Sequence, residues 1–343
     1  TASNNTAVGL SALAANTTAD NNTAVGKSAL TANTTGTYNV AVGSLALDAN
    51  TTGDSNTALG YLALSANTTA SGNVAIGRSA LLANTTGVDN VGVGFSSLDA
   101  NTTGSDNTAV GDNALGANTT GTENVAIGAD ALKTATTVSA NTAVGYRALE
   151  DNAGASNTAV GDGALRENTT AANNTAVGAY ALMENTTGTY NVAVGKGAAG
   201  ANTTASNITA IGYQALDANT TGTMNTAVGT SALGANTTGG YNTAMGVDAL
   251  VLNTTGQRNV AVGYQAMDEA TTGSDSVAVG HAAGHSVTTG IENTFVGYYA
   301  GGETTTVNYN NAFGASALQS NTTGEQNVAM GRAALYANTT ANN

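Results

Sequence analysis

A seventeen-residue repeat runs through the whole chain and restricts the folds that are open to it. The Gly of a recurring Ala-Val-Gly, here called the marker Gly, occurs in twenty copies from Gly9 to Gly331. Successive copies are 17 residues apart, except for an interval of 16 between Gly145 and Gly161. One register of this kind predicts a single continuous repeat domain over residues 1–343.

The length and composition of the repeat decide which kind of repeat fold it favours. Known helical repeats need roughly 33 to 47 residues, and this unit is rich in Thr, Asn, Val and Gly, which are poor helix formers. Two extended stretches of about four or five residues, joined by two turns, fit its length. We therefore predict an all-β fold, a parallel β-solenoid (β-roll) of about 20 coils with a 17-residue repeat.

Stacking of coils turns each position of the repeat into a column of like residues. The residue before the marker Gly is always aliphatic or Phe, and the fourth residue after it is Leu in most copies, so we expect both columns to point inward. The position three before the marker Gly is Val in eight copies and Thr in eleven, and it shares a strand face with the residue before the marker Gly. Ala, two before the marker Gly, then faces outward as a smooth surface that another chain could approach.

The polar positions predict how the coils stay in register. The marker Gly is present in all twenty copies, which indicates a positive φ or a close backbone contact. The Asn four before the marker Gly recurs in eighteen copies, and the Asn seven after it, usually that of Asn-Thr-Thr, recurs in sixteen; both should form hydrogen-bonded ladders. The paired Thr, present in nineteen copies, should form two columns of which only one is fully exposed.

Composition and charge exclude several classes of protein. The absence of Cys removes disulfides, thiolate metal sites and cysteine nucleophiles. With 8 Lys+Arg against 22 Asp+Glu, a net charge of −14 opposes binding to nucleic acid or to anionic membranes. No apolar run reaches the roughly 18 to 20 residues of a membrane span, so no membrane insertion is expected. The chain runs from Thr1 to Asn343 without a Met start, and we expect a segment of a longer fibre protein.

Several copies carry a strand signature that resembles a known family. Asn-Val-Ala-Val-Gly at 39–43 and 191–195, with Asn-Val-Ala-Ile-Gly at 73–77 and 124–128, is similar to the head repeats of trimeric autotransporter adhesins and to repeats of bacteriophage tail fibres. The resemblance implies a left-handed parallel β-roll and side-by-side association of three chains. It also implies a fibre outside the cell, or on a virion, that touches host surfaces.

The two positions after the marker Gly are the most variable and mark an exposed edge. One reading is a ribbon of Tyr and charges that engages a surface or glycan receptor, and the other, which we favour, is a tolerant solvent-facing turn. The pairs at these positions include Lys27-Ser28, Tyr61-Leu62, Arg78-Ser79, Asp112-Asn113, Tyr146-Arg147, Tyr213-Gln214, Tyr264-Gln265 and Tyr298-Tyr299.

No sequence pattern in the chain predicts a catalytic, cofactor-binding or metal-binding site. His281 and His285 have the spacing of helical metal ligands, but in a solenoid coil they should lie on opposite sides of a turn. Acidic residues recur irregularly and are interpreted as solubilising surface charge; examples are Asp48, Asp99, Asp217 and Asp268. No catalytic triad, P-loop, dinucleotide fingerprint or calcium-binding β-roll repeat is present. We therefore predict no catalytic, cofactor or metal site, and no enzyme.

Two stretches depart from the consensus. Over residues 280–313, Gly284 and Gly301 replace Leu while Phe295 and Phe313 enter, which we interpret as decay of the repeat and not as a local site. The shortened coil loses one residue near Asn152-Ala153-Gly154, where a small kink or bulge is expected.

The repeat favours a structural role. One Val and one Leu per coil contribute about 3 to 6 kcal/mol on burial, far less than the cost of ordering 17 residues. We therefore expect a homo-oligomer, with a trimer favoured by the resemblance. The predicted function is a non-catalytic structural and adhesive extracellular fibre segment. Two alternatives stay open: a filament built by end-to-end stacking of coils, and an ice-binding solenoid that uses Thr ladders.

Overall fold

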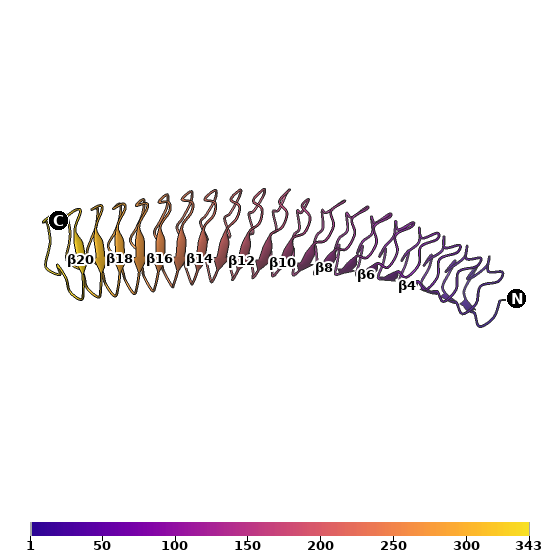
Figure 1. Cartoon of the computed structure of the whole chain (residues 1–343). Helices are drawn as coiled ribbons and strands as arrows, with labels where there is room; N and C mark the ends of the chain where they lie inside the picture. The colour runs from indigo at the N-terminus through magenta and orange to yellow at the C-terminus, as the bar shows by residue number, and fades with distance from the viewer. Residues whose placement is uncertain (1, 343) are drawn as a thin grey trace. The chain divides into compact units, whose positions relative to one another are not determined.

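The computed structural model describes residues 2–342 and confirms the predicted fold class. The chain is an all-β parallel solenoid of about 19 turns with a 17-residue repeat, and the described residues contain no helix. Each turn of backbone carries one short strand, as Figure 1 shows. The chain divides into two compact units, Thr1–Thr170 and Ala171–Asn343, and each unit contains ten of the strands.

In the first unit, each strand pairs in parallel with the next one along the chain, and like residues lie side by side; Ala41, for example, pairs with Ala58. The marker Gly follows each strand directly. The strands of this unit are β1 (Thr6–Val8), β2 (Thr23–Val25), β3 (Val40–Val42), β4 (Thr57–Leu59), β5 (Val74–Ile76), β6 (Val91–Val93), β7 (Thr108–Val110), β8 (Val125–Ile127), β9 (Thr142–Val144) and β10 (Thr158–Val160).

The second unit has the same arrangement within itself, and Ala193, for example, pairs with Ala210. Its strands are β11 (Thr175–Val177), β12 (Val192–Val194), β13 (Thr209–Ile211), β14 (Thr226–Val228), β15 (Thr243–Met245), β16 (Val260–Val262), β17 (Val277–Val279), β18 (Thr294–Val296), β19 (Asn311–Phe313) and β20 (Val328–Met330).

The strands present the opposite face to the core from the one expected. The central Ala of the strand is fully buried in nearly every coil, whereas the residues on either side of it are half-buried or exposed. The predicted inward column before the marker Gly is therefore wrong, and so is the predicted outward Ala surface. The Leu column is confirmed as buried, with Leu64 and Leu115 fully enclosed.

The width of the coil explains this choice of face. The Leu column and the small residue before it in the turn face the inner side of the strand; a Cβ on Gly92 of β6, for example, would lie 3.3 Å from Leu81 and 3.2 Å from Ser97. Only a small side chain therefore fits on the strand's inner face. A branched Val there would have to overlap these columns. The same alternation of faces that places Ala inward places its two neighbours outward together, and their shared face is confirmed.

The expected second extended stretch is absent, which corrects the prediction of two strands per coil. After the marker Gly the backbone alternates into the left-handed region, at the second residue and again at the Leu, as in Ser79 (φ 59°) and Leu81 (φ 51°). Such alternation cannot form a strand. The turn is still tied to the next coil, because Leu81 N–H donates to the carbonyl of Ser97 at 2.9 Å.

Both Asn ladders are confirmed. In the column before the strand, the backbone N–H of Asn107 donates to Oδ1 of Asn90 (3.0 Å), and its side-chain amide donates to the carbonyl of Gly121 (2.9 Å). In the other column, Nδ2 of Asn101 donates to Oδ1 of Asn84 (2.8 Å). These buried amides hydrogen-bond to the neighbouring coil, and this keeps the register at the corners.

The Thr columns behave as expected in most coils: the first Thr is half-buried and the second exposed. The hydroxyl of the first Thr is used within the fold, since Thr102 Oγ1 donates to the carbonyl of Thr119 at 2.9 Å. The shortened coil loses its residue within this turn, where Asn152 Nδ2 donates to the carbonyl of Gly154 (2.7 Å). The pairing of β9 with β10 is uninterrupted, so the strands carry no bulge there.

The divergent coils of 280–313 are repacked. Phe295 takes the place of a strand Ala, points inward and is fully buried. A Cβ on Gly284 would lie 2.9 Å from the Phe295 ring, and a Cβ on Gly301 would lie 2.5 Å from it. The two glycines therefore replace Leu because the ring occupies the space of the Leu side chains. This corrects the interpretation of these changes as decay.

Candidate interaction surfaces

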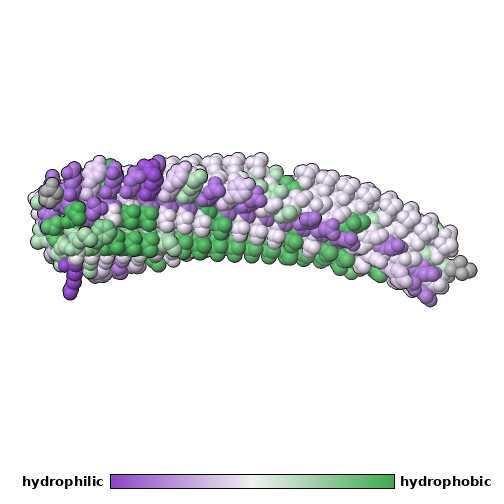
Figure 2. Space-filling view, viewed as in Figure 1, coloured by the Kyte–Doolittle hydropathy of each residue, from purple (hydrophilic) through white to green (hydrophobic). Residues whose placement is uncertain are grey.

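The outer sheet face, defined as the side chains three residues and one residue before each marker Gly, is the first candidate surface. It is a two-column strip of Thr or Val, with one Asn at Asn311, beside Val, Ile, Leu, Met or Phe. Figure 2 shows hydrophobic side chains gathered in a band over the strands of the second unit. The exposed large apolar members are Val8, Val40, Leu59, Ile127 and Val160 in the first unit, and Val177, Val192, Val194, Ile211, Met245, Phe313, Val328 and Met330 in the second.

This face is also free of charge. None of the twenty copies has a Lys, Arg, Asp or Glu in either column, although the chain carries a net charge of −14. The exposed fraction of Leu59 is 46% and that of Ile127 is 40%. A face in contact with water alone would tolerate charged residues, and large exposed apolar strips mark interaction sites.

The corner after the marker Gly is exposed, as predicted from its variability. Tyr61 and Tyr213 project from it with exposed fractions of 48% and 49%. In the second unit, Tyr264, His281 and Tyr298 occupy this position in three successive coils and form a stack, with ring centroids 5.2 Å apart at each step. Stacked rings at coil spacing make this part of the corner an aromatic strip.

The two histidines share one aromatic neighbour. Both rings approach Tyr299, with centroid distances of 5.9 Å for His281 and 6.3 Å for His285. Nδ1 of His285 contacts the Asp268 carboxylate. Within residues 2–342, no group of three or more His, Asp or Glu side chains is placed to hold a metal ion.

The four acidic residues Asp48, Asp99, Asp217 and Asp268 occupy the same position, five residues after the marker Gly. Their interpretation as plain surface charge is wrong, because Asp48, Asp99 and Asp217 are half-buried in the corner and Asp268 is buried there. Burial raises the pKa of each carboxyl above its ordinary value. Desolvation thus makes these four carboxyls easier to protonate than they would be if fully exposed to water.

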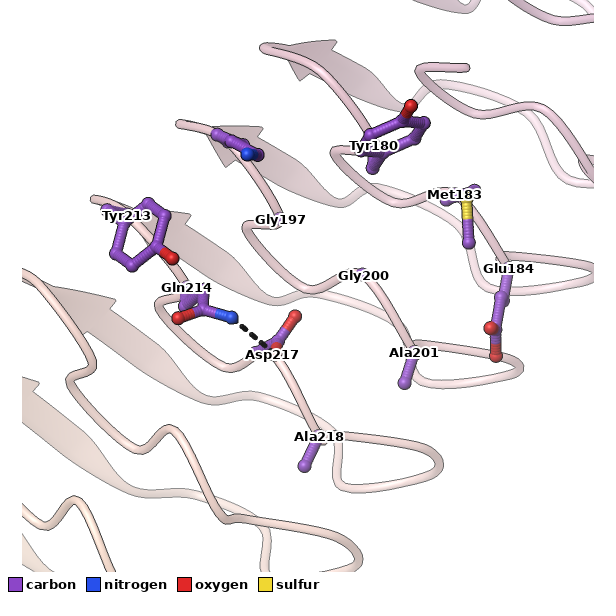
Figure 3. Close-up of a pocket in the computed structure, with 11 residues that line it drawn as sticks. Tyr180, Met183, Glu184, Gly197, Gly200, Ala201, Tyr213, Gln214, Asp217 and Ala218 are labelled. Atoms are coloured by element: carbon purple, nitrogen blue, oxygen red, sulfur yellow. Dashed lines mark hydrogen bonds between the residues drawn. The ribbon is translucent and has the colours of Figure 1, made fainter. Parts of the chain in front are cut away.

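A groove of about 560 Å³ opens on this corner of the second unit. Its centre is the coil that follows Gly195, where Gly197 and Gly200 have no side chains to fill the space. Figure 3 shows Tyr180 on the coil before this floor and Tyr213 on the coil after it. Asp217 lies at the groove and accepts a hydrogen bond from Nε2 of Gln214 (3.3 Å).

A second, smaller hollow of about 250 Å³ adjoins the first. It shares Gln214 and Asp217 with the groove and continues over Ser231 and Gly234 of the next coil. Sequence reasoning missed both hollows, although a signal existed. The coil of Gly195 is the only one of the twenty with Gly at both the second and the fifth position after the marker Gly.

No protein-family model, curated protein or solved structure matches the chain. Among the described residues there is no helix long and apolar enough to cross a membrane.

Proposed function

We propose that the chain is a non-catalytic structural and adhesive segment of an extracellular fibre, on a cell surface or a virion, whose copies associate side by side through the outer sheet face. A homotrimer is the favoured assembly. The observation that carries this proposal is the absence of charge from a regular, half-exposed apolar strip that recurs in every coil.

The energetics of the strip support association along many coils. Burying a half-exposed Val or Ile contributes on the order of 1 kcal/mol. Summed over the ten coils of one unit, this gives on the order of 10 kcal/mol, which is comparable to the cost of bringing partners together, about 4 to 15 kcal/mol. A few coils would not hold a partner. Many coils in succession add enough buried apolar surface to hold a partner, which fits the large number of repeats in the chain.

The Thr columns support ice binding less well. The hydroxyl of the first Thr is engaged by the carbonyl of the next coil, so this column does not offer a free lattice of hydroxyls. On the outer sheet face, Thr is interrupted by Val in eight copies. We therefore place the interaction with other chains ahead of an interaction with ice.

Sedimentation velocity of the purified chain tests the proposal. We expect a species whose mass is a multiple of 33.3 kDa. The variant with Val93→Glu, Val110→Glu and Ile127→Glu places three like charges on the outer sheet face of consecutive coils. It should dissociate to monomer, because each carboxylate would be desolvated in the interface.

A matched control carries the same charge on another face. Thr103→Glu, Thr120→Glu and Thr137→Glu change three exposed residues of the second Thr column in consecutive coils. This variant has the same added charge at the same spacing, and it should keep the wild-type mass. A wild-type chain that is monomeric at micromolar concentration, or equal dissociation of both variants, would refute association through the outer sheet face.

A further inference from the structure

We propose that the groove over Gly197 and Gly200, together with the adjoining hollow, binds a neutral oligosaccharide. This inference deepens the adhesive part of the proposed function and rests on it. Nevertheless, the groove lies on the corner after the marker Gly and shares no residue with the outer sheet face. Binding and association can therefore be measured separately.

The floor of the groove is made by the two glycines. A Cβ on Gly197 would lie 3.4 Å from Oδ1 of Asp217, and a Cβ on Gly200 would lie 3.0 Å from the same atom. In the neighbouring coil the equivalent positions hold Tyr180 and Met183, which are large. Replacing both by Gly leaves a gap one coil wide in which a ligand can approach the backbone closely.

The walls supply the apolar contacts that a sugar ring uses. Tyr180 and Tyr213 stand on the coils that flank the glycine floor, and Met183 adds apolar surface beside Tyr180. The C–H groups of a pyranose pack against an aromatic face, and the groove offers one such residue on each side. Concave sites with mostly apolar walls and a few placed polar groups are typical of small-ligand sites.

The polar groups of the groove suit a ligand with neutral hydroxyl groups better than a charged ligand. Asp217 offers carboxylate acceptors, while the Gln214 amide provides both a donor and an acceptor beside them. The charged side chains have both signs, with Lys196 opposed by Glu184 and Asp217. A strongly anionic or cationic ligand would meet a like charge at the groove, whereas a neutral polyol can use all of these groups.

The backbone argues against an extended peptide as the ligand. A peptide strand would need free main-chain donors, but the N–H of Gly197 donates to the carbonyl of Ala179 (3.0 Å) and the N–H of Gly200 donates to that of Gly197 (3.1 Å). Recognition in the groove therefore falls to side chains. Because the second hollow shares Gln214 and Asp217 with the first, a chain of at least two sugar units would use both.

Calorimetric titration of the full chain provides the test. The probes are neutral tetrasaccharides of glucose, mannose, galactose and N-acetylglucosamine, with a sialylated oligosaccharide, a glucosamine tetrasaccharide and an unrelated tetrapeptide for comparison. We expect at least one neutral tetrasaccharide to bind, and its disaccharide to bind more weakly. If no neutral probe binds, or if only a charged probe or the peptide binds, the proposal is overturned.

Filling the groove should abolish this binding without harm to the fold. Gly197→Tyr with Gly200→Met recreates the pair that the preceding coil already carries at Tyr180 and Met183. The left-handed backbone of Gly197 (φ 66°) is also adopted by Tyr180 (φ 61°), so Tyr is compatible with it. We expect the affinity of the double variant to fall roughly tenfold or more, the equivalent of 1.4 kcal/mol. Unchanged affinity would refute the site.

Matched variants separate the groove from general effects. Tyr213→Ala should weaken binding roughly tenfold, while Tyr213→Phe keeps the ring and should stay within about threefold of the wild type. Tyr61→Ala removes an equally exposed ring at the same position of another coil and should have no effect. Gly116→Met fills the fifth position after a marker Gly outside the groove and should also have none.

Sedimentation of the same samples keeps the two proposals distinguishable. The groove variants should retain the wild-type mass, and the outer-face variant should still bind the tetrasaccharide. Loss of association with binding intact would leave the groove in place and refute only the role of the outer sheet face.

Discussion

At the scale of single residues, the marker Gly is the position that tolerates least. Its φ ranges from 116° to 144° over the twenty copies, which side chains of L-residues rarely adopt. Space is equally restricted, because a Cβ on Gly60 would lie 2.5 Å from the carbonyl oxygen of Gly77 in the next coil. The conformation and the close approach of coils both require Gly, and this explains its presence in every copy.

We expect Gly60→Ala to destabilise the chain by about 2 to 4 kcal/mol, since strain and a backbone clash add. Gly116→Ala is the matched control, because its φ is not in the left-handed region and the new Cβ would be 3.3 Å from its nearest neighbour, the Asn113 carbonyl oxygen. That change should stay within about 1 kcal/mol. Urea unfolding followed by circular dichroism measures both, and similar midpoints for the two variants would contradict this account.

At the scale of one coil, side-chain sizes at different positions of the repeat compensate each other: a larger residue at one position is accompanied by smaller residues at the positions that face it. Phe295 on β18 and the two glycines at 284 and 301 change together, and the ring fills the space that two Leu side chains occupy elsewhere. A similar exchange occurs at β6, where Gly92 replaces Ala and Ser97 replaces the Ala of the turn. A Cβ on Gly92 would lie 3.2 Å from Oγ of Ser97, so the smaller residue accommodates the larger one.

The exchange at Phe295 predicts strong coupling between substitutions. Phe295→Ala alone should cost about 3 to 5 kcal/mol, because it leaves a cavity in a coil that lacks Leu. Gly301→Leu alone should also destabilise, because its Cβ would lie 2.5 Å from the ring. The triple variant with Phe295→Ala, Gly284→Leu and Gly301→Leu restores the consensus and should recover most of the loss. Urea midpoints that simply add across the three changes would disprove the exchange.

At the scale of the whole molecule, each coil within a unit is held by its neighbours through ladders that repeat with the sequence. Backbone bonds, two Asn columns and the Thr hydroxyls all connect one coil to the next. Stability in such a structure is close to a sum of coil terms and nearest-neighbour terms. The effect of an insertion or deletion on stability should therefore depend more on its length, relative to the 17-residue repeat, than on its position in the chain.

Deletion of residues 60–76 removes one whole repeat and joins Leu59 to Gly77 in register. We expect this variant to fold with an unchanged circular dichroism signal per residue, because every ladder finds its partner in the next coil. Deletion of residues 60–67 breaks the register and should expose the interior to hydrogen exchange over the adjoining coils. Equal protection in the two variants would show that the ladders do not set the fold.

The repeat alone was sufficient to predict the parallel stacking, the Asn ladders, the Gly corner and the Leu column. Each of these depends on like residues overlaying one another, and a fixed period of 17 makes that unavoidable. The departures of Gly284 and Gly301 could not be interpreted in the same way, because the residue that explains them, Phe295, occupies another position of the coil. The residues of one column in the sequence do not show how much space the side chains of the facing column occupy.

The sequence by itself determined the period, and through it the fold class and the columns. Only the tertiary structure decided which side of each strand faces inward, because a strand alternates its faces and Ala or Val inward are equivalent in the pattern. The volume already taken by Leu and by the small turn residue before it selects Ala, and this leaves the branched residues outside as the outer sheet face. The groove was decided in the same way, since its walls come from three coils that become neighbours only when the chain is wound.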